Sequence, residues 1–410
     1  MNSNNNLIKN IAIVWENQEI GGVDSYLYFI LSNKNFSFFN ISVYTNKHNN
    51  ASKILEEKLK KFNNIKFFYF SSFFIFKFNF FILKFFYYFL RPIFFFFTYL
   101  KFKIIFFNKE FDLIMAVCGG YGSFRSEPAA LLSYNKKKCL KTLIVCHDTQ
   151  GAPIFQNFIL RCIDRILSKN ISSVISISKA TRDSLRQKTD LFLTNKNLHD
   201  PVIYIGVPKI HANKVYLSLF NKKENDAYNI GIVSRIEPYK GHEDLCVAFS
   251  KLNNDIKNKI KIFFIGPYED EYKNKISKLI SILNIEKYVL FSGYLNEPSQ
   301  EIISNLDLLL SLTRNFEGFG ISLAEAMSVR TPILATKVGA ISEFLNEKNA
   351  YLIEPSSPSQ ITEAIINFIN NNNLWKIRSN VAYDDFFKIY NSDIMCEELL
   401  IHFKNRYNLL

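Results

Sequence analysis

The sequence predicts an α/β protein with two domains, each built on a parallel sheet. At 410 residues the chain is long enough for two cores of ordinary size. Short apolar segments alternate with helical stretches in both halves, which is the order typical of parallel strands joined by helices. A polar and uneven stretch, residues 213–228, is typical of a linker between domains. We therefore expect a first domain at residues 1–207 and a second at residues 208–380.

Each expected strand is a short apolar run bounded by turn-forming or polar residues. The first domain is predicted to contain strands at residues 11–15, 41–45, 65–70, 112–118, 142–146, 173–177 and 202–205. The second domain is predicted to contain strands at residues 230–234, 262–265, 289–292, 308–312, 332–335 and 351–353.

Cysteine usage and the first residues both indicate a cytosolic protein. The cysteines form no Cys-x-x-Cys pair and lie mostly in apolar runs, so we expect reduced core residues rather than metal ligands or disulfides. Residues 1–10 lack the apolar run of an export signal. The six cysteines are Cys118, Cys139, Cys146, Cys162, Cys246 and Cys396.

The positive charge of the chain, formally +13, is confined to its first half. Residues 1–205 hold 27 Lys and Arg against 13 Asp and Glu, a net +14, whereas residues 206–410 hold 23 against 24, a net −1. A basic half could bind nucleic acid, but no nucleic-acid-binding motif accompanies the charge. We therefore expect a negatively charged membrane surface as the partner, and no nucleic acid.

Residues 67–107 form an aromatic and basic segment that favours membrane association. The segment contains 19 of the 41 phenylalanines, four tyrosines, five basic residues and no acidic residue. Lys77, Lys84 and Arg91 follow one another at intervals of seven, so on a helix they share one face. An aromatic face opposite such a stripe is typical of a helix that lies in the membrane interface. The aromatic residues away from the stripe are Phe78, Phe81, Phe85, Phe86 and Phe89.

Two other arrangements of residues 67–107 remain open at this point. The helices could pack into the core of their own domain with the lysines extending outward, or they could insert into lipid as a hairpin. No uncharged stretch approaches the roughly 18 residues that a membrane span requires. Pro92 favours two helices over one long helix. We expect binding at the membrane surface.

Two glutamates lie eight positions apart across a glycine-rich turn in residues 315–325. Gly318 and Gly320 allow the backbone to turn tightly and to approach a ligand. The residues that follow predict a helix, whose free N–H groups form an anion site at its start. Glu317 on the loop and Glu325 inside the helix can accept hydrogen bonds from two sets of hydroxyls. A nucleotide sugar, with a sugar on each side of its phosphates, would satisfy all three features.

Residues 315–343 resemble the retaining glycosyltransferases of family 4, which have the GT-B fold. The family's E-x7-E motif falls on Glu317 and Glu325. Val329 and Arg330 stand where the family usually has small residues, Gly in particular. This departure concerns the local turn more than the chemistry.

The resemblance implies two Rossmann-like domains that face each other across a cleft. The first domain would bind the acceptor, and the second would bind the nucleotide sugar. It also implies that the C-terminal helix, residues 381–410, crosses back to the first domain.

Two cations, Arg235 and Lys240, follow the strand expected at residues 230–234. The family carries an Arg and a Lys at corresponding places, so the resemblance implies that these two residues hold the diphosphate of the donor. A leaving nucleoside diphosphate gains negative charge as the glycosidic bond breaks, so fixed cations there lower the barrier. Arg235, Lys240 and the helix start at Gly320 can together take the place of a metal ion at the diphosphate. The sequence contains no Asp-x-Asp motif that could hold a metal ion.

Two further candidate sites lie in the first domain. His147 and Asp148 end the strand expected at residues 142–146, at the carboxyl edge where ligands bind in open α/β sheets. Family members often have a histidine here that contacts the donor sugar. Gly21 and Gly22 follow the first strand and open a helix, and the resemblance implies that this loop contacts the donor diphosphate. An ordinary strand-to-helix turn would have the same pattern.

The sequence therefore predicts a retaining, metal-independent glycosyltransferase that moves a sugar from a nucleotide diphosphate to an acceptor hydroxyl. By resemblance, Glu325 binds the ribose hydroxyls of the nucleotide and Glu317 binds the transferred sugar. The N–H groups of Gly318, Phe319 and Gly320 assist the cations at the diphosphate. No cofactor or metal is expected. The predicted catalytic residues are Glu317, His147, Arg235 and Lys240.

The aromatic and basic first domain suggests a lipid-linked or glycan acceptor at the cytoplasmic face of the membrane, in the synthesis of a surface polysaccharide, a lipopolysaccharide or a glycolipid. Two alternatives remain: an epimerase of the same fold acting on a nucleotide sugar, and a membrane-bound nucleotide-sugar-binding protein without catalysis. The nucleobase and the sugar of the donor are left open.

Overall fold

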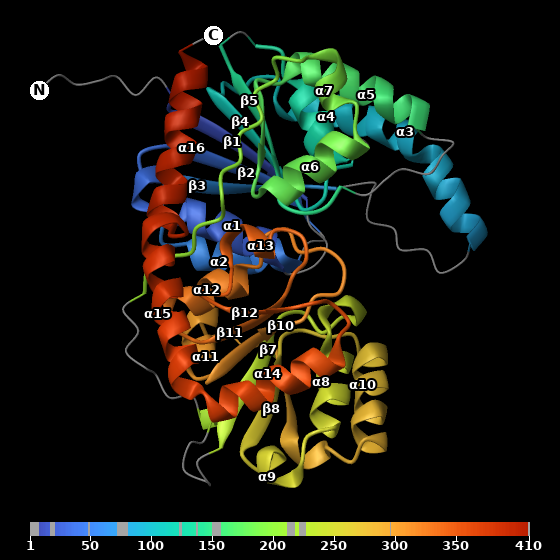
Figure 1. Cartoon of the computed structure of the whole chain (residues 1–410). Helices are drawn as coiled ribbons and strands as arrows, with labels where there is room; N and C mark the ends of the chain where they lie inside the picture. The colour runs from blue at the N-terminus through green and yellow to red at the C-terminus, as the bar shows by residue number, and fades with distance from the viewer. Residues whose placement is uncertain are drawn as a thin grey trace, which may run out of the picture. The chain divides into compact units, whose positions relative to one another are not determined.

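The computed structural model describes residues 8–16, 21–47, 50–71, 81–122, 125–136, 138–149, 157–210, 218–220, 227–295 and 297–408. Of residues 81–89 it describes the backbone only. The chain divides into two compact units (Figure 1). Unit 1 comprises Met1–Gly206 and Ser392–Leu410, and unit 2 comprises Val207–Asn391.

Unit 1 contains a parallel six-stranded sheet in the order β3-β2-β1-β4-β5-β6. The central strands are almost entirely buried and rich in Ile, Val and Ala, as expected for a parallel sheet covered on both faces. The strands are β1 (Asn10–Trp15), β2 (Asn40–Asn46), β3 (Ile65–Phe70), β4 (Leu113–Cys118), β5 (Leu140–Val145) and β6 (Ser173–Ser176).

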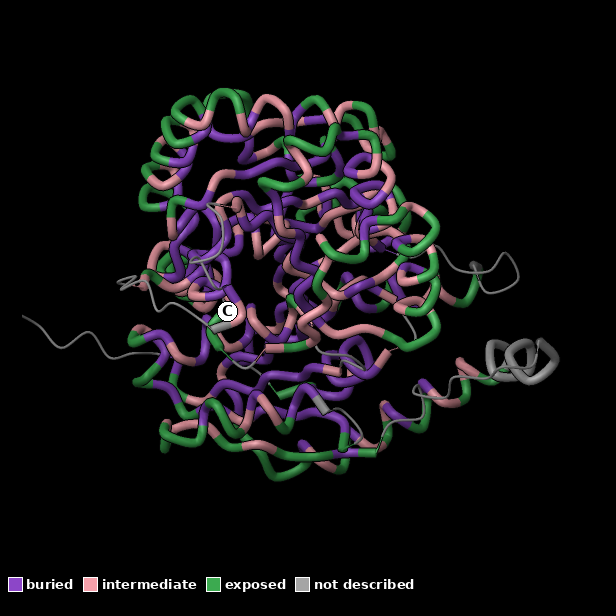
Figure 2. Tube along the Cα trace, turned by 90° about the horizontal axis from the view of Figure 1, so that it is seen from below, coloured by how far each residue is buried: buried purple, intermediate pink, exposed green. Residues whose placement is uncertain are grey.

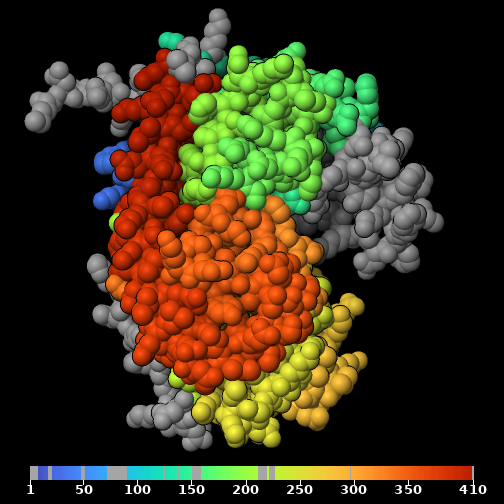
Figure 3. Space-filling view, viewed as in Figure 1, coloured from blue at the N-terminus to red at the C-terminus, as the bar shows by residue number. Residues whose placement is uncertain are grey.

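The first five helices of unit 1 connect successive parallel strands, two more follow its last strand, and the C-terminal helix α16 packs with this unit. In Figure 3 the residues of α5 to α7, coloured green, form much of the visible face of unit 1. The helices are α1 (Gly22–Leu31), α2 (Asn50–Leu59), α3 (Phe81–Ile105), α4 (Ser126–Ser133), α5 (Asn157–Asn170), α6 (Lys179–Lys188), α7 (Leu191–Thr194) and α16 (Ser392–Tyr407).

Unit 2 repeats the architecture with a sheet in the order β12-β11-β10-β7-β8-β9, again parallel throughout. Figure 2 shows that buried residues follow the strands in the interior while exposed residues lie on the outer turns. The strands are β7 (Tyr228–Val233), β8 (Ile260–Ile265), β9 (Val289–Gly293), β10 (Leu308–Ser311), β11 (Ile333–Thr336) and β12 (Tyr351–Ile353).

A cluster of buried apolar side chains from the sheet and helices of unit 2 forms a core, with Trp375 and Phe249 among the largest. The helices are α8 (His242–Ser250), α9 (Asn254–Lys257), α10 (Asp270–Ile282), α11 (Ser299–Ser304), α12 (Ile321–Ser328), α13 (Ile341–Phe344), α14 (Pro358–Asn370) and α15 (Asn372–Ile389).

The prediction of two parallel α/β domains is confirmed, and one predicted strand is wrong. Residues 202–205 make only an isolated bridge, between Val202 and Ser176. The segment lies between Pro201 and Pro208, which have no backbone N–H to donate. Ile203 donates its N–H to the carbonyl of Ser176, and one such bond does not extend into a ladder.

The prediction that Pro92 separates two helices is also wrong, because α3 runs through it. A proline inside a helix removes one backbone hydrogen bond, which tertiary packing of the helix can outweigh. Beyond Pro92, Phe95 packs with Ala129 of α4 and Ile163 of α5, and Phe102 packs in the main core of unit 1. Of the predicted basic stripe, Arg91 is described and is half-buried, whereas the side chains of Lys77, Lys84 and the predicted aromatic face at residues 78–89 lie outside the described part of the chain.

Candidate functional site

The strand order of unit 2 places its candidate site between β7 and β10. From β7 the chain continues to β8 and β9 on one side, whereas β10 lies on the other side of β7. The loops that leave the carboxyl ends of these two strands therefore diverge, and ligands of open α/β sheets bind in such a crevice. Arg235 and Lys240 follow β7, and Glu317 follows β10. The topology thus brings three of the predicted residues to one edge of one sheet.

Lys240 and Glu317 form an ion pair, with 2.8 Å between Nζ of the lysine and Oε2 of the glutamate. Both side chains are mostly buried. The hydroxyl of Thr313 donates a second hydrogen bond, of 3.3 Å, to the same carboxylate oxygen. Two residues that are 77 positions apart in the chain are therefore held together by charge.

Arg235 lies beside the same turn and has partners within it. Its guanidinium contacts Glu237 at 2.7 Å and donates to the hydroxyl of Tyr239 at 3.2 Å. Burial raises the pKa of Tyr239, and the hydrogen bond with Glu237 raises it further. The phenol of Tyr239 is therefore neutral at physiological pH. The guanidinium and the phenol thus form a polar wall next to Lys240.

Arg314 ties the two loops together and was not predicted from the sequence. Its guanidinium makes two hydrogen bonds of 2.8 Å to the carboxylate of Asp244, at the start of α8. Its backbone N–H donates to the carbonyl of Tyr239 at 2.8 Å. The hydrogen bonds that it donates to Asp244 raise the pKa of Arg314, which therefore stays charged. The rule that cations follow strand ends at a switch point could have identified this residue, because it comes three positions after β10.

Helix α12 begins where the glycine-rich turn predicts it. Gly320 precedes its first residue with φ of +89°, a left-handed conformation that glycine adopts readily. Phe319 is buried and stacks on Phe344, with ring centroids 4.8 Å apart. The side chain of Phe319 thus anchors the loop against α13.

Glu325 is buried inside α12 and accepts a hydrogen bond from the hydroxyl of Ser299, at the start of α11. Burial raises the pKa of Glu325 to about 7, although the bond from Ser299 acts in the opposite direction. Its carboxyl group therefore changes charge near neutral pH. Ser299 was not predicted from the sequence.

Gly339 supports the loop that carries Glu317. Its φ is +54°, and a Cβ atom at this position would lie 2.2 Å from the carbonyl oxygen of Glu317 and 2.7 Å from its nitrogen. The next residue, Ala340, donates its N–H to that carbonyl at 2.9 Å. The close approach of the two chain segments therefore requires glycine.

The remaining predicted residues belong to unit 1. His147 follows β5, at the carboxyl edge of that sheet. The carboxylate of the neighbouring Asp148 accepts hydrogen bonds from Lys188 and Ser184 of α6. Burial alone would raise the pKa of Asp148, but these two partners outweigh burial and lower the pKa. Asp148 thus joins β5 to α6.

Gly22 is the first residue of α1, as its place after β1 predicts. The N–H of Gly21 donates to the carboxylate of Asp24 in the first turn of this helix, at 2.7 Å. Asp24 therefore satisfies part of the helix start within the chain itself.

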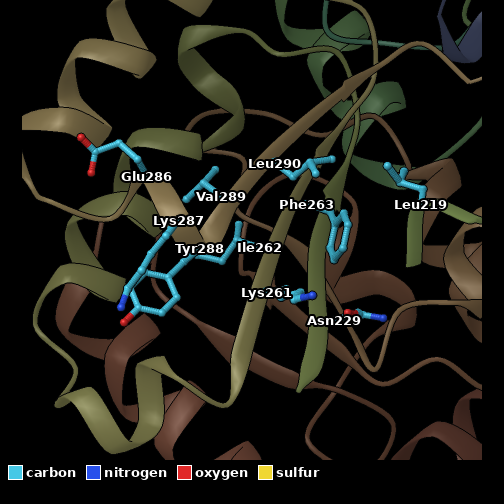
Figure 4. A pocket seen from close by; sticks show the side chains of 10 residues that line it. All are labelled: Leu219, Asn229, Lys261, Ile262, Phe263, Glu286, Lys287, Tyr288, Val289 and Leu290. Carbon is cyan, nitrogen blue, oxygen red and sulfur yellow. The ribbon is translucent and has the colours of Figure 1, made fainter. Parts of the chain in front are cut away.

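One pocket of about 380 Å³ lies away from these residues, at the opposite edge of the unit 2 sheet (Figure 4). Asn229, Lys261 and Val289 line it from the first residues of β7, β8 and β9. Because ligands of such sheets bind at the carboxyl ends of the strands, this pocket is not the predicted site.

Within the described ranges, no group of three or more His, Cys, Asp or Glu side chains could hold a metal ion. None of the helices in the described part of the chain is both long and apolar enough to span a membrane.

Comparison with known proteins identifies the second half of the chain. Residues 219–384 match the family model of the glycosyl transferases group 1. A poly(ribitol-phosphate) alpha-N-acetylglucosaminyltransferase of Staphylococcus aureus is 30% identical over 173 residues, which are 42% of this chain. That match covers only 34% of the Staphylococcus aureus protein, so this chain spans about a third of its length. The uncharacterised glycosyltransferase MJ1069 of Methanocaldococcus jannaschii is 26% identical over 290 residues, which are 68% of this chain and 72% of that protein.

Solved structures show the same fold across the whole chain. HepE of Anabaena, in complex with UDP and glucose, superposes with a TM-score of 0.73 over 97% of this chain and 100% of its own, at 16% identity. A glycosyltransferase of Rickettsia africae superposes equally well, over 97% of this chain and 98% of its own, at 15% identity. The predicted GT-B fold is therefore confirmed, and the match to the group 1 glycosyl transferases lies within unit 2.

Proposed function

We propose that this chain is a retaining, metal-independent glycosyltransferase of family 4 that transfers a sugar from a nucleotide diphosphate to an acceptor hydroxyl. The observation that carries the proposal is the convergence of Arg235, Lys240 and Glu317 at the switch point of unit 2. This convergence lies within the part of the chain that matches the group 1 glycosyltransferases. The two cations suit a diphosphate, and the carboxylate suits the hydroxyls of a sugar.

The proposed donor contacts follow from the order of charges along this edge. Arg235 and Lys240 would neutralise the diphosphate, assisted by the N–H groups of the turn at residues 318–320. Glu317 would accept hydrogen bonds from the transferred sugar, and Glu325 from the ribose. Lys240 and Glu317 form an ion pair and so hold each other in position. A bound nucleotide sugar would place its diphosphate beside Lys240 and its sugar hydroxyls beside Glu317.

The proposed chemistry rests on charge neutralisation. As the glycosidic bond breaks, negative charge develops on the departing phosphate, and cations fixed beside it stabilise the transition state. Each such pair, at about 4 Å and an effective dielectric constant near 20, contributes on the order of 4 kcal/mol of attraction before desolvation. These fixed cations can supply the neutralisation that a metal would otherwise give. His147 of unit 1 would orient the transferred sugar or stabilise the positive charge that develops on it.

The relatives suggest the classes of donor and acceptor. HepE has been solved with UDP-glucose, and relatives in Staphylococcus aureus and Bacillus subtilis are named for transfer to poly(ribitol-phosphate) and poly(glycerol-phosphate). By analogy, the proposed donor is a UDP-sugar and the proposed acceptor is a glycan, a lipid-linked sugar or another cell-surface polymer.

A titration with nucleotide sugars tests the donor site. UDP-glucose, UDP-galactose, UDP-N-acetylglucosamine and GDP-mannose are added without metal, and binding is followed by ligand NMR. We expect selective binding that Glu325→Ala weakens about 10–100-fold, because a hydrogen bond to a charged group contributes about 1.5–3 kcal/mol. Since ionised Glu325 is the stronger acceptor, affinity should rise as the pH increases through about 7. If none of the four bound, the proposal would lose its basis.

We also propose that unit 1 associates with the cytoplasmic face of an anionic membrane. From Leu90 to Phe107, just past its C-terminal end, α3 presents an exposed apolar stripe at alternating intervals of three and four residues, which is one face of a helix. Ile104 and Phe107 are 77% and 75% exposed. The described residues of this stripe are Leu90, Ile93, Phe97, Leu100, Ile104 and Phe107.

The charge around this stripe supports an anionic lipid surface rather than a protein core as its occupant. Residues 67–107 contain no acidic residue, and Lys103 extends from α3 with its ammonium 5.4 Å from the ring of Tyr99. Basic residues near an anionic leaflet contribute about 1 kcal/mol each. Core packing accounts for the opposite face of α3, where Phe95 and Phe102 are buried, but not for the exposed face.

Sedimentation with vesicles tests the membrane proposal. We expect the protein to sediment with vesicles of phosphatidylcholine and phosphatidylserine, and Ile104→Asp to weaken this binding at least about tenfold, since one buried apolar side chain contributes about 1.5–3 kcal/mol. Phe38→Asp is the matched control, because Phe38 is an exposed phenylalanine outside this segment. Equal sedimentation of both variants would contradict the role of α3, as would a wild-type protein that ignores both anionic and neutral vesicles.

A further inference from the structure

Unit 1 has a switch point of its own, between β1 and β4. From β1 the chain continues to β2 and β3 on one side, whereas β4 pairs with β1 on the other side. This is the same relation that positions the donor residues in unit 2, so a ligand is expected here for the same topological reason. Glu16 follows β1 directly, and Glu127 lies in the first turn of α4, the helix that follows β4.

Hydrogen bonds connect three chain segments at this switch point. The backbone N–H of Glu16 donates to Oε1 of Glu127 at 3.2 Å. The amide of Asn46, the last residue of β2, donates to Oε1 of the Glu16 side chain at 3.1 Å. Glu16 is partly exposed, whereas Glu127 lies beneath it and has no exposed surface.

The second carboxyl oxygen of Glu127, Oε2, has no hydrogen-bond partner within the described chain. A buried polar group without a partner costs about 1–3 kcal/mol of folding stability. The start of α4 accounts for a carboxylate in this region through the helix dipole, but it does not account for an oxygen that no donor reaches. A ligand that supplies the missing partner does account for it.

The protonation states of the two carboxyl groups define what that ligand must offer. Burial raises the pKa of Glu127 to about 8; Arg125 acts against this increase and the neighbouring Glu16 adds to it. At neutral pH Glu127 is therefore protonated, and its Oε1 already accepts from the N–H of Glu16, which leaves the O–H on Oε2 as a free donor. The carboxyl oxygens of Glu16 beside it can accept hydrogen bonds.

We propose that Glu127 and Glu16 together bind a hydroxyl group of the acceptor, which is a polyhydroxylated carbohydrate. The O–H of Glu127 donates a hydrogen bond to the hydroxyl oxygen. The hydroxyl group in turn donates a hydrogen bond to the carboxyl group of Glu16. A hydroxyl group satisfies both residues because it is donor and acceptor at once. An ammonium group has no acceptor for the O–H of Glu127, and a fully ionised phosphate has no donor for Glu16. The inference rests on the proposed function and names the acceptor subsite within it.

Binding of simple glycosides to the full chain tests this subsite. The probes are the methyl glycosides of glucose, galactose and N-acetylglucosamine, followed by saturation-transfer NMR. We expect at least one to bind, Glu127→Gln and Glu16→Gln each to weaken it about tenfold or more, and the control Glu110→Gln to have no effect. Glu110 is exposed and lies in the same unit. Glu16→Gln changes a partly exposed residue, so it keeps the test informative if Glu127→Gln fails to fold.

Donor titrations on the same variants separate the two proposals. Nucleotide sugars should bind these variants as tightly as they bind the wild type, because the donor residues lie in unit 2. If nucleotide sugars bind but Glu127→Gln and wild type bind the glycoside equally, or no glycoside binds at all, the subsite is wrong and the proposed function stands. If no nucleotide sugar binds, it is the proposed function that fails.

The pH profile adds an outcome that a structural role of Glu127 would not produce. Glycoside binding should be strongest below about pH 8 and should weaken above it, as Glu127 ionises and is repelled by Glu16. The other charged or titratable groups that act on this pair are Arg125 before α4, Cys118 at the end of β4 and Lys101 of α3. Binding that strengthens above pH 8 would indicate a cation site and overturn the proposal, as would binding that does not change between pH 6.5 and pH 9.

Discussion

Replacing Lys240 by alanine is expected to lower the turnover of the nucleotide sugar about 10²–10³-fold, which is the scale for losing one preorganised charge partner of the transition state. The substitution removes a cation from the diphosphate and also leaves the carboxylate of Glu317 without its ion pair. Release of nucleoside diphosphate, with water or an alcohol as acceptor, measures the effect.

Lys275→Ala provides the matched control for Lys240→Ala. The side chain of Lys275 is 68% exposed and pairs with Glu243 on the surface of the same unit. Surface ion pairs of this kind contribute little, so the control should retain wild-type turnover. An unchanged turnover in Lys240→Ala would remove this lysine from the mechanism.

Replacing Gly339 by alanine is expected to reduce activity about 100-fold and to lower the free energy of unfolding by about 1–3 kcal/mol. The added Cβ atom would meet the backbone of Glu317 at 2.2 Å, so one of the two segments must move. A displacement of about 1 Å in a positioned group can cost about 10²-fold in rate, and overpacking costs about 1–3 kcal/mol. Chemical denaturation and donor titration measure the two effects.

Gly293→Ala separates the clash at Gly339 from backbone strain. Gly293 also has a left-handed conformation, with φ of +71°, but the nearest atom to an added Cβ is 3.9 Å away. This variant should lose only the about 1–2 kcal/mol of the left-handed backbone. If the two variants lost the same stability and Gly339→Ala kept full donor affinity, close packing beneath Glu317 would not matter for the site.

The sequence predicts the sheets well because buried parallel strands are continuous apolar runs, which local patterns reveal. Its failures have different causes. Residues 202–205 have the composition of a strand, but the prolines on either side of them have no backbone N–H to donate. Pro92 lies in a helix that packs against α4 and α5 on one face. Both outcomes depend on tertiary context rather than on the local sequence.

The same distinction applies to the candidate sites. Lys240 and Glu317 could be predicted because they belong to a recognisable motif, and their 2.8 Å contact follows from the strand order. Arg314 could have been noted as a cation after a strand end, but the partners of Arg314 and of Glu127 could not be predicted, because they depend on tertiary structure. Asp244 holds Arg314 from a different loop, and one oxygen of Glu127 lacks any described partner. No sequence pattern records either relation.

The departure at Arg330 has a consequence for how unit 2 opens. Arg330 has φ of +58°, the conformation for which glycine would be the usual residue, and its guanidinium lies 3.3 Å from the centre of the Tyr383 ring. This stacking attaches the end of α12 to α15. Because of this attachment, the backbone amides of α12 should exchange with solvent together with those of α15, as one cooperative unit. Helix α12 carries Glu325, so this residue belongs to the same unit. A strained arginine thus makes the stability of the long helix part of the stability of the candidate site.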